Sequence, residues 1–312
     1  GVEVSHPSSS GYPNVPGFQD KADEGWEKIV KAVQEEGSKI FPQLWHVGAM
    51  RKEGMAPDPK VPGYTPSGLV NTNKEAAHAM SAEEVEMLIE CFVKDIIKIK
   101  DLGFDGVELH GAHGYLIDNF FWEGTNQRDD TYGGEIDKRT KFACEIIKRA
   151  RKEIGRDFPI AIRFSQWKQQ DYEAKIAHTP EELEKFLMPL VDAGVDVMLG
   201  SDVGGGTSLS PFATMKAAYE IGQFSGYSLT PEQAFWLSTA GGAETLSLGD
   251  KIGRLSPGYE ADVVVLDLNS TAVIAQRMQR AESLRDILFA QMIMADDRAI
   301  RAVYVEGRKV VG

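Results

Sequence analysis

The densest group of chemically capable side chains lies in residues 108–115, which read ELHGAHGY. Two imidazoles, His110 and His113, are followed two positions later by the phenol of Tyr115. If these groups converge, the imidazoles can hold an anionic or carbonyl oxygen of a substrate while the phenol delivers a proton. A metal-binding pair and two solvated loop histidines are the alternatives. The metal is less favoured, because no carboxylate or cysteine nearby completes a recognisable ligand set.

Two further polar residues are expected at the same edge as this trio. Gln43 and Arg163 lie in two other predicted strands, residues 39–45 and 159–165. A side-chain amide can donate and accept hydrogen bonds, and a guanidinium can stabilise negative charge that develops on a ring. Taken singly, each would be an ordinary polar cap of a strand, so their interpretation depends on where the strands meet.

The elements that must position these residues follow a strand–loop–helix order. Apolar residues at helical spacing predict four helices, at 21–36, 81–102, 135–154 and 180–193. Short buried runs predict four strands, at 39–45, 104–109, 159–165 and 195–200. Residues 1–20 and 50–73 are rich in Gly, Pro and Ser and are predicted to be loops. This order and spacing indicate a parallel sheet of the (β/α) barrel type, with its active site on the loops that follow the strands.

The strand count falls short of a closed barrel, which needs eight strands. After residue 200 the pattern changes to helices near 210–225, 230–240 and 281–294 and short strands at 261–266, 300–305 and 309–311. We therefore predict an α/β fold derived from a TIM barrel, incomplete or chimeric, with a small C-terminal β module. An open half-barrel exposes strand edges and an apolar face, so a homodimer is one hypothesis.

Composition narrows the class of protein. The 312 residues include 34 Lys+Arg and 47 Asp+Glu, a net charge of −13, which leaves no broad basic surface for nucleic acid or anionic lipid. Two cysteines are too few for a disulfide framework, and we find neither an apolar run of membrane-spanning length nor a signal segment. We expect a cytoplasmic enzyme that acts on a small molecule, with no nucleic-acid or membrane partner.

Four stretches resemble the old yellow enzyme family, which comprises FMN-dependent ene-reductases on a (β/α)8 barrel. They are residues 42–48 (PQLWHVG), 106–116 (GVELHGAHGYL), 126–134 (NQRDDTYGG) and 162–165 (IRFS). The resemblance runs from residue 1 to about 197. It implies a flavoprotein that reduces an activated C=C bond with hydride from NAD(P)H through FMN.

The same resemblance implies a role for each candidate residue. Gln43 would contact the flavin pyrimidine and Arg163 its electron-rich N1/O2 edge. His110 and His113 would bind the activating oxygen of the substrate, and Tyr115 would donate the proton. The two last barrel strands of the family, whose loops grip the FMN phosphate, have no counterpart after residue 200, so the phosphate site is expected to be missing.

The remainder of the chain, from about 198 to 312, resembles guanine deaminase of the amidohydrolase superfamily. The stretches are residues 200–210 (GSDVGGGTSLS), 241–243 (GGA), 253–262 (GRLSPGYEAD) and 303–308 (VYVEGR). The resemblance implies that Asp202 binds a catalytic metal, which would be zinc. A deaminase of this type also needs a His-x-His pair, and none of the six histidines forms one. Asp202 is therefore expected to be an orphan ligand.

Together these observations predict three segments. Residues 1–197 would be a flavin-barrel segment, residues 198–248 the last barrel strand and helices of an amidohydrolase, and residues 249–312 a small β-rich module. We rank an FMN-dependent oxidoreductase ahead of a metal-dependent guanine deaminase, because the first keeps a group of side chains on one rim and the second keeps one ligand. A chimeric chain with neither activity is the third hypothesis.

Overall fold

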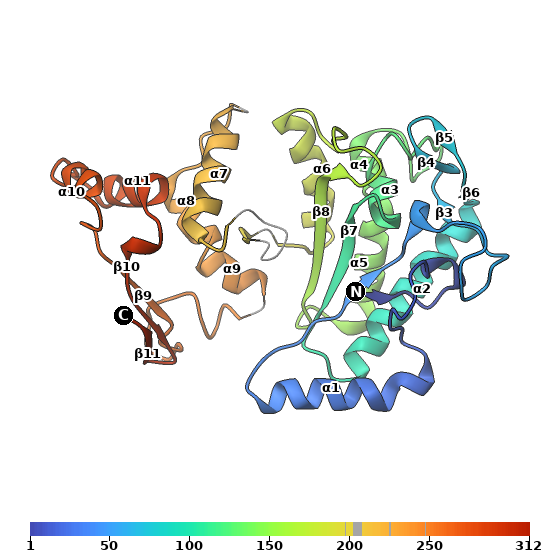
Figure 1. The fold of residues 1–312 in the computed structure, drawn as a ribbon, viewed down its shortest axis with the longest axis horizontal. Coiled ribbons are helices and arrows are strands. Elements are labelled where there is room, and N and C mark those ends of the chain that lie inside the picture. Colours follow the sequence, from blue (N-terminus) through green and yellow to red (C-terminus); the bar gives the residue numbers. More distant parts are fainter. Residues whose placement is uncertain (197, 202–207, 225, 247) are drawn as a thin grey trace. The chain divides into compact units, whose positions relative to one another are not determined.

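The computed structural model describes the whole chain except residues 197, 202–207, 225 and 247. The chain divides into two compact units, Gly1–Val195 and Asp196–Gly312 (Figure 1). Among the described residues, no helix combines the length and the apolar character that crossing a membrane requires.

Unit 1 is built on a parallel sheet of four strands in the order β1–β2–β7–β8. The strands are β1 (Val2–Glu3), β2 (Gln43–Trp45), β7 (Val107–His113) and β8 (Ile160–Lys168). Parallel neighbours cannot be joined by a tight turn, so the chain returns between the longer strands through helices. The predicted α/β class with a parallel sheet is confirmed, together with three of the four predicted strands.

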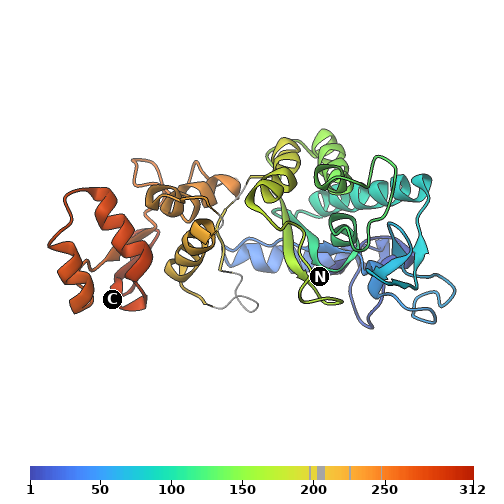
Figure 2. The same cartoon turned by 90° about the horizontal axis from the view of Figure 1, so that it is seen from above.

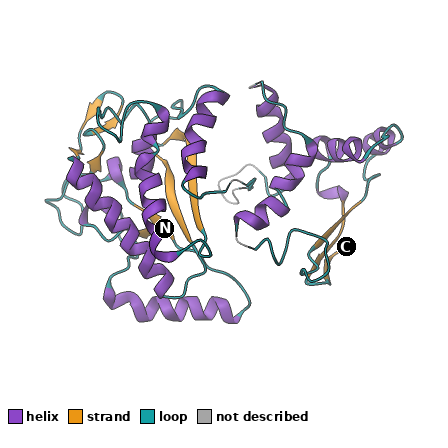
Figure 3. Cartoon of the chain, turned by 180° about the vertical axis from the view of Figure 1, so that it is seen from behind, coloured by secondary structure: helices purple, strands orange, loops and turns teal. Residues whose placement is uncertain are grey.

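Six α-helices accompany this sheet in the described part of unit 1. They are α1 (Asp23–Glu35), α2 (Ala82–Asp101), α3 (Leu116–Phe121), α4 (Ile136–Arg139), α5 (Lys141–Ile154) and α6 (Pro180–Asp192). The predicted capping box starts α2: Ser81 Oγ accepts the Glu84 N–H at 3.2 Å, and the Glu84 carboxylate accepts the Ser81 N–H at 2.8 Å. Seen from behind, α2 and α5 run in front of the strands (Figure 3).

Apolar side chains alternate with polar ones along the strands, which gives the sheet one apolar face. Leu44 of β2 pairs in register with Leu109 of β7, and both side chains are fully buried. Helices α2 and α5 contribute the fully buried Phe92 and Phe142, and the Phe142 ring stacks on Phe120 of α3 at a centroid distance of 4.2 Å. These apolar side chains belong to one continuous core, so burial of this face fixes which side of each strand remains available for polar residues. Figure 2 shows from above how helices α2 and α5 lie against one side of this sheet.

The fourth predicted strand, residues 195–200, is wrong for the described residues of that segment, which form no strand. The Val195 N–H bonds back to Leu190 O at the end of α6, and the Leu199 N–H bonds to Leu237 O at 3.3 Å. The backbone groups that a strand would offer to β8 are therefore used elsewhere. The fourth strand of the sheet is instead β1, whose residues Val2–Glu3 lie in the predicted loop 1–20.

The predicted loop 50–73 contains the short strands β3 (Tyr64–Thr65) and β4 (Leu69–Asn71). Their partners follow the segment: β3 pairs with β6 (His78–Ala79), and β4 pairs with β5 (Lys74–Glu75). Its first half is organised by Arg51, whose side chain is buried. The guanidinium donates to five main-chain carbonyls, those of Ser10, Met55, Ala56, Asp58 and Val61. A guanidinium carries five N–H donors, so this one side chain supplies hydrogen bonds to the carbonyl groups of a loop that has little regular structure.

Unit 2 contains five described α-helices and a small antiparallel sheet. The helices are α7 (Pro211–Phe224), α8 (Pro231–Leu237), α9 (Ala240–Thr245), α10 (Ala272–Met278) and α11 (Leu284–Met294). The sheet has the order β11–β10–β9, with β9 (Val263–Leu266), β10 (Ile300–Val305) and β11 (Arg308–Val311). The three short strands predicted near the C-terminus are thus confirmed. The core is small and includes Phe212, Met215 and Met292.

We predict that Arg51→Met lowers the free energy of unfolding by about 3 kcal/mol, because it leaves several carbonyl groups of the buried loop without a donor. Urea unfolding followed by tryptophan fluorescence measures the change. The matched control is Lys52→Met at the neighbouring exposed position. Equal stability of the two variants would contradict the role given to Arg51.

Candidate active site

The register of the parallel sheet brings three of the predicted site residues to one face. Gln43 pairs with Glu108, and His110 pairs with Arg163. Paired residues of neighbouring strands point to the same side, and so do residues two apart along one strand. Gln43, His110 and Arg163 therefore share the face opposite the apolar one. Trp45, two residues after Gln43, lies on this face as well.

His113 and Tyr115 reach the same place by a turn at the end of β7. His113 is three residues from His110, so a straight strand would place the two imidazoles on opposite faces. The register with β8 shifts between Gly111 and His113, and His113 has a left-handed φ of 63°. The imidazole centroids of His110 and His113 then lie 5.2 Å apart, and the Tyr115 ring lies 5.1 Å from His110. The trio predicted from the sequence is thus assembled.

Gly114 is required at this turn. Its φ is 83°, a backbone angle that residues other than glycine rarely adopt. A Cβ at this position would lie 1.8 Å from Oε1 of Gln170. Tyr115 follows as the N-cap residue of α3, with its N–H bonded to Ala112 O. The turn thereby brings the start of α3 back toward the middle of β7.

Aromatic rings that the sequence did not single out surround the trio. Trp45 meets Tyr115 edge to face at 4.8 Å, and Tyr12 stacks on Trp45 at 5.6 Å. On the other side, Trp167 stacks on His113 at 4.6 Å. Tyr12 and Trp167 are 42% and 41% exposed, so this aromatic group reaches the surface of the protein. Trp45 could have been found from its spacing of two from Gln43, whereas Tyr12 and Trp167 carry no such signal.

Burial controls the protonation of His110 and Tyr115. Desolvation lowers the pKa of His110 to about 4, with further lowering by the charges of His113 and Arg163. His110 is therefore neutral at neutral pH, and its Nδ1 has no hydrogen-bond partner among the described residues. Desolvation also raises the pKa of Tyr115 to about 12, and its hydrogen bond with Tyr12 adds to the effect. Tyr115 thus remains a protonated phenol, as a proton donor must.

The polar face has the donor set that the ring of a flavin requires. The amide of Gln43 can pair with the alternating donors and acceptors of a pyrimidine, and it already donates to the Glu108 carboxylate, which fixes its orientation. Arg163 supplies a cation on the same face, and the unpaired Nδ1 of His110 leaves a hydrogen-bonding position for a ligand. These residues fit the ring portion of FMN. A missing phosphate site remains a prediction, because residues 202–207 lie outside the described chain.

Asp202, the predicted metal ligand, also lies outside the described residues. Within the described part of the chain, no group of three or more His, Cys, Asp or Glu side chains is arranged to hold a metal ion. Zinc binding by Asp202 therefore stays a prediction.

A parallel sheet with helices on its apolar face and convergent polar residues on the other defines an α/β protein of the type that builds barrel enzymes. The chain belongs to the NADH:flavin oxidoreductase / NADH oxidase family through residues 2–201, and to the amidohydrolase family through residues 149–311. The two matches overlap over residues 149–201. The predicted old yellow enzyme and amidohydrolase families are thereby confirmed, while guanine deaminase as the member resembled stays a prediction.

Individual relatives agree with the first match. The chain is 35% identical over 192 residues to 12-oxophytodienoate reductase 2 of Arabidopsis thaliana, covering 58% of this chain and 50% of the relative. It is 36% identical over 181 residues to NADH oxidase of Thermoanaerobacter brockii, covering 57% and 27%. A solved structure of morphinone reductase superposes with a TM-score of 0.55 at 25% identity, covering 67% of this chain and 60% of that one. The chain thus spans half or less of the length of these two curated relatives.

We predict that His110 makes the protein sensitive to acid. Its folded-state pKa of about 4 lies below the unfolded value of about 6.5, so the unfolded chain binds the proton more readily. This contribution destabilises the fold progressively as the pH falls from about 6.5 to 4, by up to roughly 3 kcal/mol. Urea unfolding at several pH values should therefore show a shallower acid loss in His110→Asn than in the wild type. The same substitution at the exposed His178 is the control, and equal slopes in all three proteins would refute the prediction.

Proposed function

We propose that unit 1 carries the site of an FMN-dependent oxidoreductase that reduces an activated C=C bond with NAD(P)H as the reductant. The observation that carries the proposal is the convergence of His110, His113 and Tyr115 on the sheet face that also presents Gln43 and Arg163. Membership of the flavin oxidoreductase family supports the same class of reaction. A relative named a 12-oxophytodienoate reductase favours an unsaturated carbonyl compound as the substrate class.

The residues of the site would divide the work as follows. FMN, when bound, supplies the hydride that NAD(P)H has delivered to it. His110 and His113 donate hydrogen bonds to the carbonyl oxygen of the substrate, which draws electron density away from the C=C bond. Tyr115 gives its phenolic proton to the carbon next to the carbonyl. Gln43 and Arg163 hold the flavin ring, and the cation of Arg163 favours negative charge on the reduced ring.

Metal-dependent guanine deaminase activity is the second candidate, and the amidohydrolase match over residues 149–311 favours it. Its weakness is chemical: the catalytic metal of such an enzyme needs several ligands, and the sequence offers Asp202 without a His-x-His pair. We therefore place it second. A chimeric chain that joins parts of the two families without either activity is the third candidate, because the chain covers 50% and 27% of the two curated oxidoreductase relatives.

The reductase proposal predicts that the purified chain binds FMN. Titration of the protein into FMN should shift the flavin absorption spectrum, and NADPH should bleach the bound flavin. Gln43→Ala and Arg163→Ala should each weaken FMN binding about tenfold or more, since each removes a hydrogen-bonding partner of the ring. Arg156→Ala, at an exposed position, is the control. A flavin spectrum that does not respond to the protein would rule the proposal out.

Tyr115→Phe tests the proton donor separately from the flavin. A general acid contributes typically 10²–10⁴-fold, so the oxidation of reduced enzyme by 2-cyclohexenone should slow by about 100-fold. The reduction of the flavin by NADPH needs no proton from Tyr115 and should keep its rate. Stopped-flow absorbance measures the two half-reactions apart, with Tyr172→Phe at an exposed tyrosine as the control. Equal losses in both half-reactions would contradict the assigned role.

A further inference from the structure

The His113–Gly114 turn that assembles the trio is held by side chains outside it. The His113 N–H donates to Ser165 Oγ at 2.9 Å, and its carbonyl accepts the Gln169 N–H at 3.2 Å. The Gly114 N–H donates to Asp118 Oδ2 at 2.7 Å. The Gly114 carbonyl accepts from the amides of Asn119 and Gln170. Every main-chain polar group of the turn is thus satisfied from α3 or from β8 and the loop after it.

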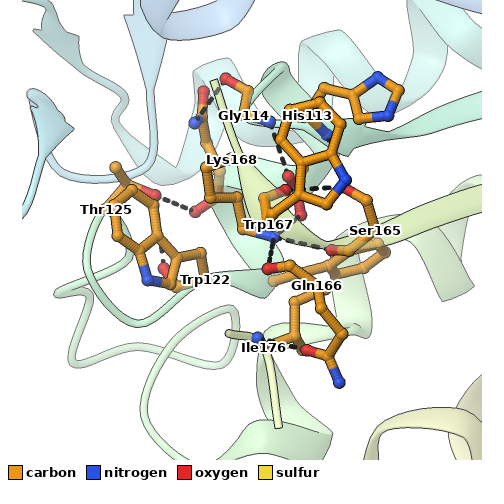
Figure 4. Close-up of polar contacts among 12 residues, drawn as sticks. His113, Gly114, Trp122, Thr125, Ser165, Gln166, Trp167, Lys168 and Ile176 are labelled. Atoms are coloured by element: carbon orange, nitrogen blue, oxygen red, sulfur yellow. Dashed lines mark hydrogen bonds and ion pairs between the residues drawn. The ribbon is translucent and has the colours of Figure 1, made fainter. Parts of the chain in front are cut away.

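Two of these supporting residues, Asp118 and Ser165, are joined through the buried side chain of Lys168. Nζ of Lys168 lies 2.9 Å from Oδ1 of Asp118, and neither side chain has any exposed surface. The same Nζ donates to the carbonyl of Ser165 at 2.8 Å and to that of Gln166 at 3.0 Å. Lys168 therefore holds both the carboxylate that binds Gly114 and the residue whose hydroxyl binds His113. Figure 4 shows Lys168 beside Ser165, with His113 and Gly114 close to it.

The turn needs this support because its conformation is strained. A non-glycine residue with a positive φ is disfavoured, and His113 adopts it next to a glycine that is itself left-handed. The ion pair also contributes little net free energy of folding, because the cost of removing two charges from water offsets much of their attraction. Burial raises the pKa of Asp118 to about 7 and lowers that of Lys168, which reflects this cost. An apolar pair of similar size would fill the same space, but it could not bind the turn.

We propose that Lys168 and Asp118 are positioning residues of the site: their buried ion pair fixes the His113–Gly114 turn and so sets the placement of His113 and Tyr115 against His110. The catalytic part of this inference rests on the proposed reductase function. Its structural part, the placement of the His113 ring, does not. Lys168 and Asp118 touch neither the substrate nor the flavin in this assignment, and they act through the turn.

The test compares Lys168→Met, Asp118→Leu and the double variant in the 312-residue chain, because leucine has the branched shape of aspartate but no acceptor for the Gly114 N–H. The double variant restores charge balance with side chains of similar size, so it separates folding from positioning and carries the test if a single variant fails to fold. The first readout is the NMR signal of the His113 imidazole, assigned with His113→Asn. This signal is sensitive to the Trp167 ring stacked on it. The second readout is kcat for reduction of 2-cyclohexenone by NADPH, alongside FMN affinity. The matched control is Asp23→Leu with Lys98→Met, which removes a partly exposed pair at 3.0 Å in the same unit.

We expect the double variant to regain most of the thermal stability that the single variants lose. Its His113 signal should nevertheless remain displaced, and its kcat should remain about 100-fold low, because a shift of about 1 Å in a catalytic group costs that much. FMN affinity should be unchanged, and the control pair should match the wild type in every readout. A double variant with a native His113 signal and normal kcat would overturn the proposal and leave the pair a purely structural role. If the wild type reduces no enone, the proposed function fails, while the NMR comparison still decides whether the pair positions the turn.

Discussion

The site depends on one geometric constraint, the odd spacing of His110 and His113 on a parallel strand. Side chains alternate with a period of two, so residues three apart face opposite sides unless the strand is interrupted. The interruption here is a register shift followed by two left-handed residues, His113 and Gly114. This interruption brings His113 and Tyr115 into contact with the surrounding aromatic rings. It also places the turn beside the buried Lys168–Asp118 pair and the N-terminus of α3. Locally unfavourable backbone geometry is thus concentrated where the side chains meet.

The sequence predicts most elements of unit 1 because local signals and tertiary packing agree there. The capping box at Ser81 and the apolar stripe that follows it locate α2 within a residue at each end. The buried runs around Leu44, Leu109 and Ile160 likewise locate three strands, since both their composition and their burial favour the sheet. Gln43, His110 and Arg163 could be grouped in advance, because the carboxyl ends of adjacent parallel strands lie at the same edge of a sheet.

Other features depend on contacts that no local pattern encodes. Residues 195–200 are apolar enough for a strand, yet their backbone partners lie at Leu190 and Leu237. Val2–Glu3 is too short to be recognised and becomes a strand only because β2 offers it an edge. Lys168 and Asp118 are separated by 50 positions and form a buried ion pair. By residue type alone each would be assigned to the surface, because charged side chains are almost never buried unless they are paired. Tyr12 and Trp167 join the site by the same kind of long-range contact.

Arg51 has a consequence for the diversity of such sites. It holds the first half of the 50–73 segment through carbonyl oxygens alone, which every amino acid possesses. The path of that segment is therefore independent of the side chains it carries, apart from those that its turns require. The other side chains of residues 52–61 can be exchanged while the backbone keeps its course. A single buried cation of this kind lets a loop vary in sequence while its backbone path is kept, in natural divergence and in engineered libraries alike.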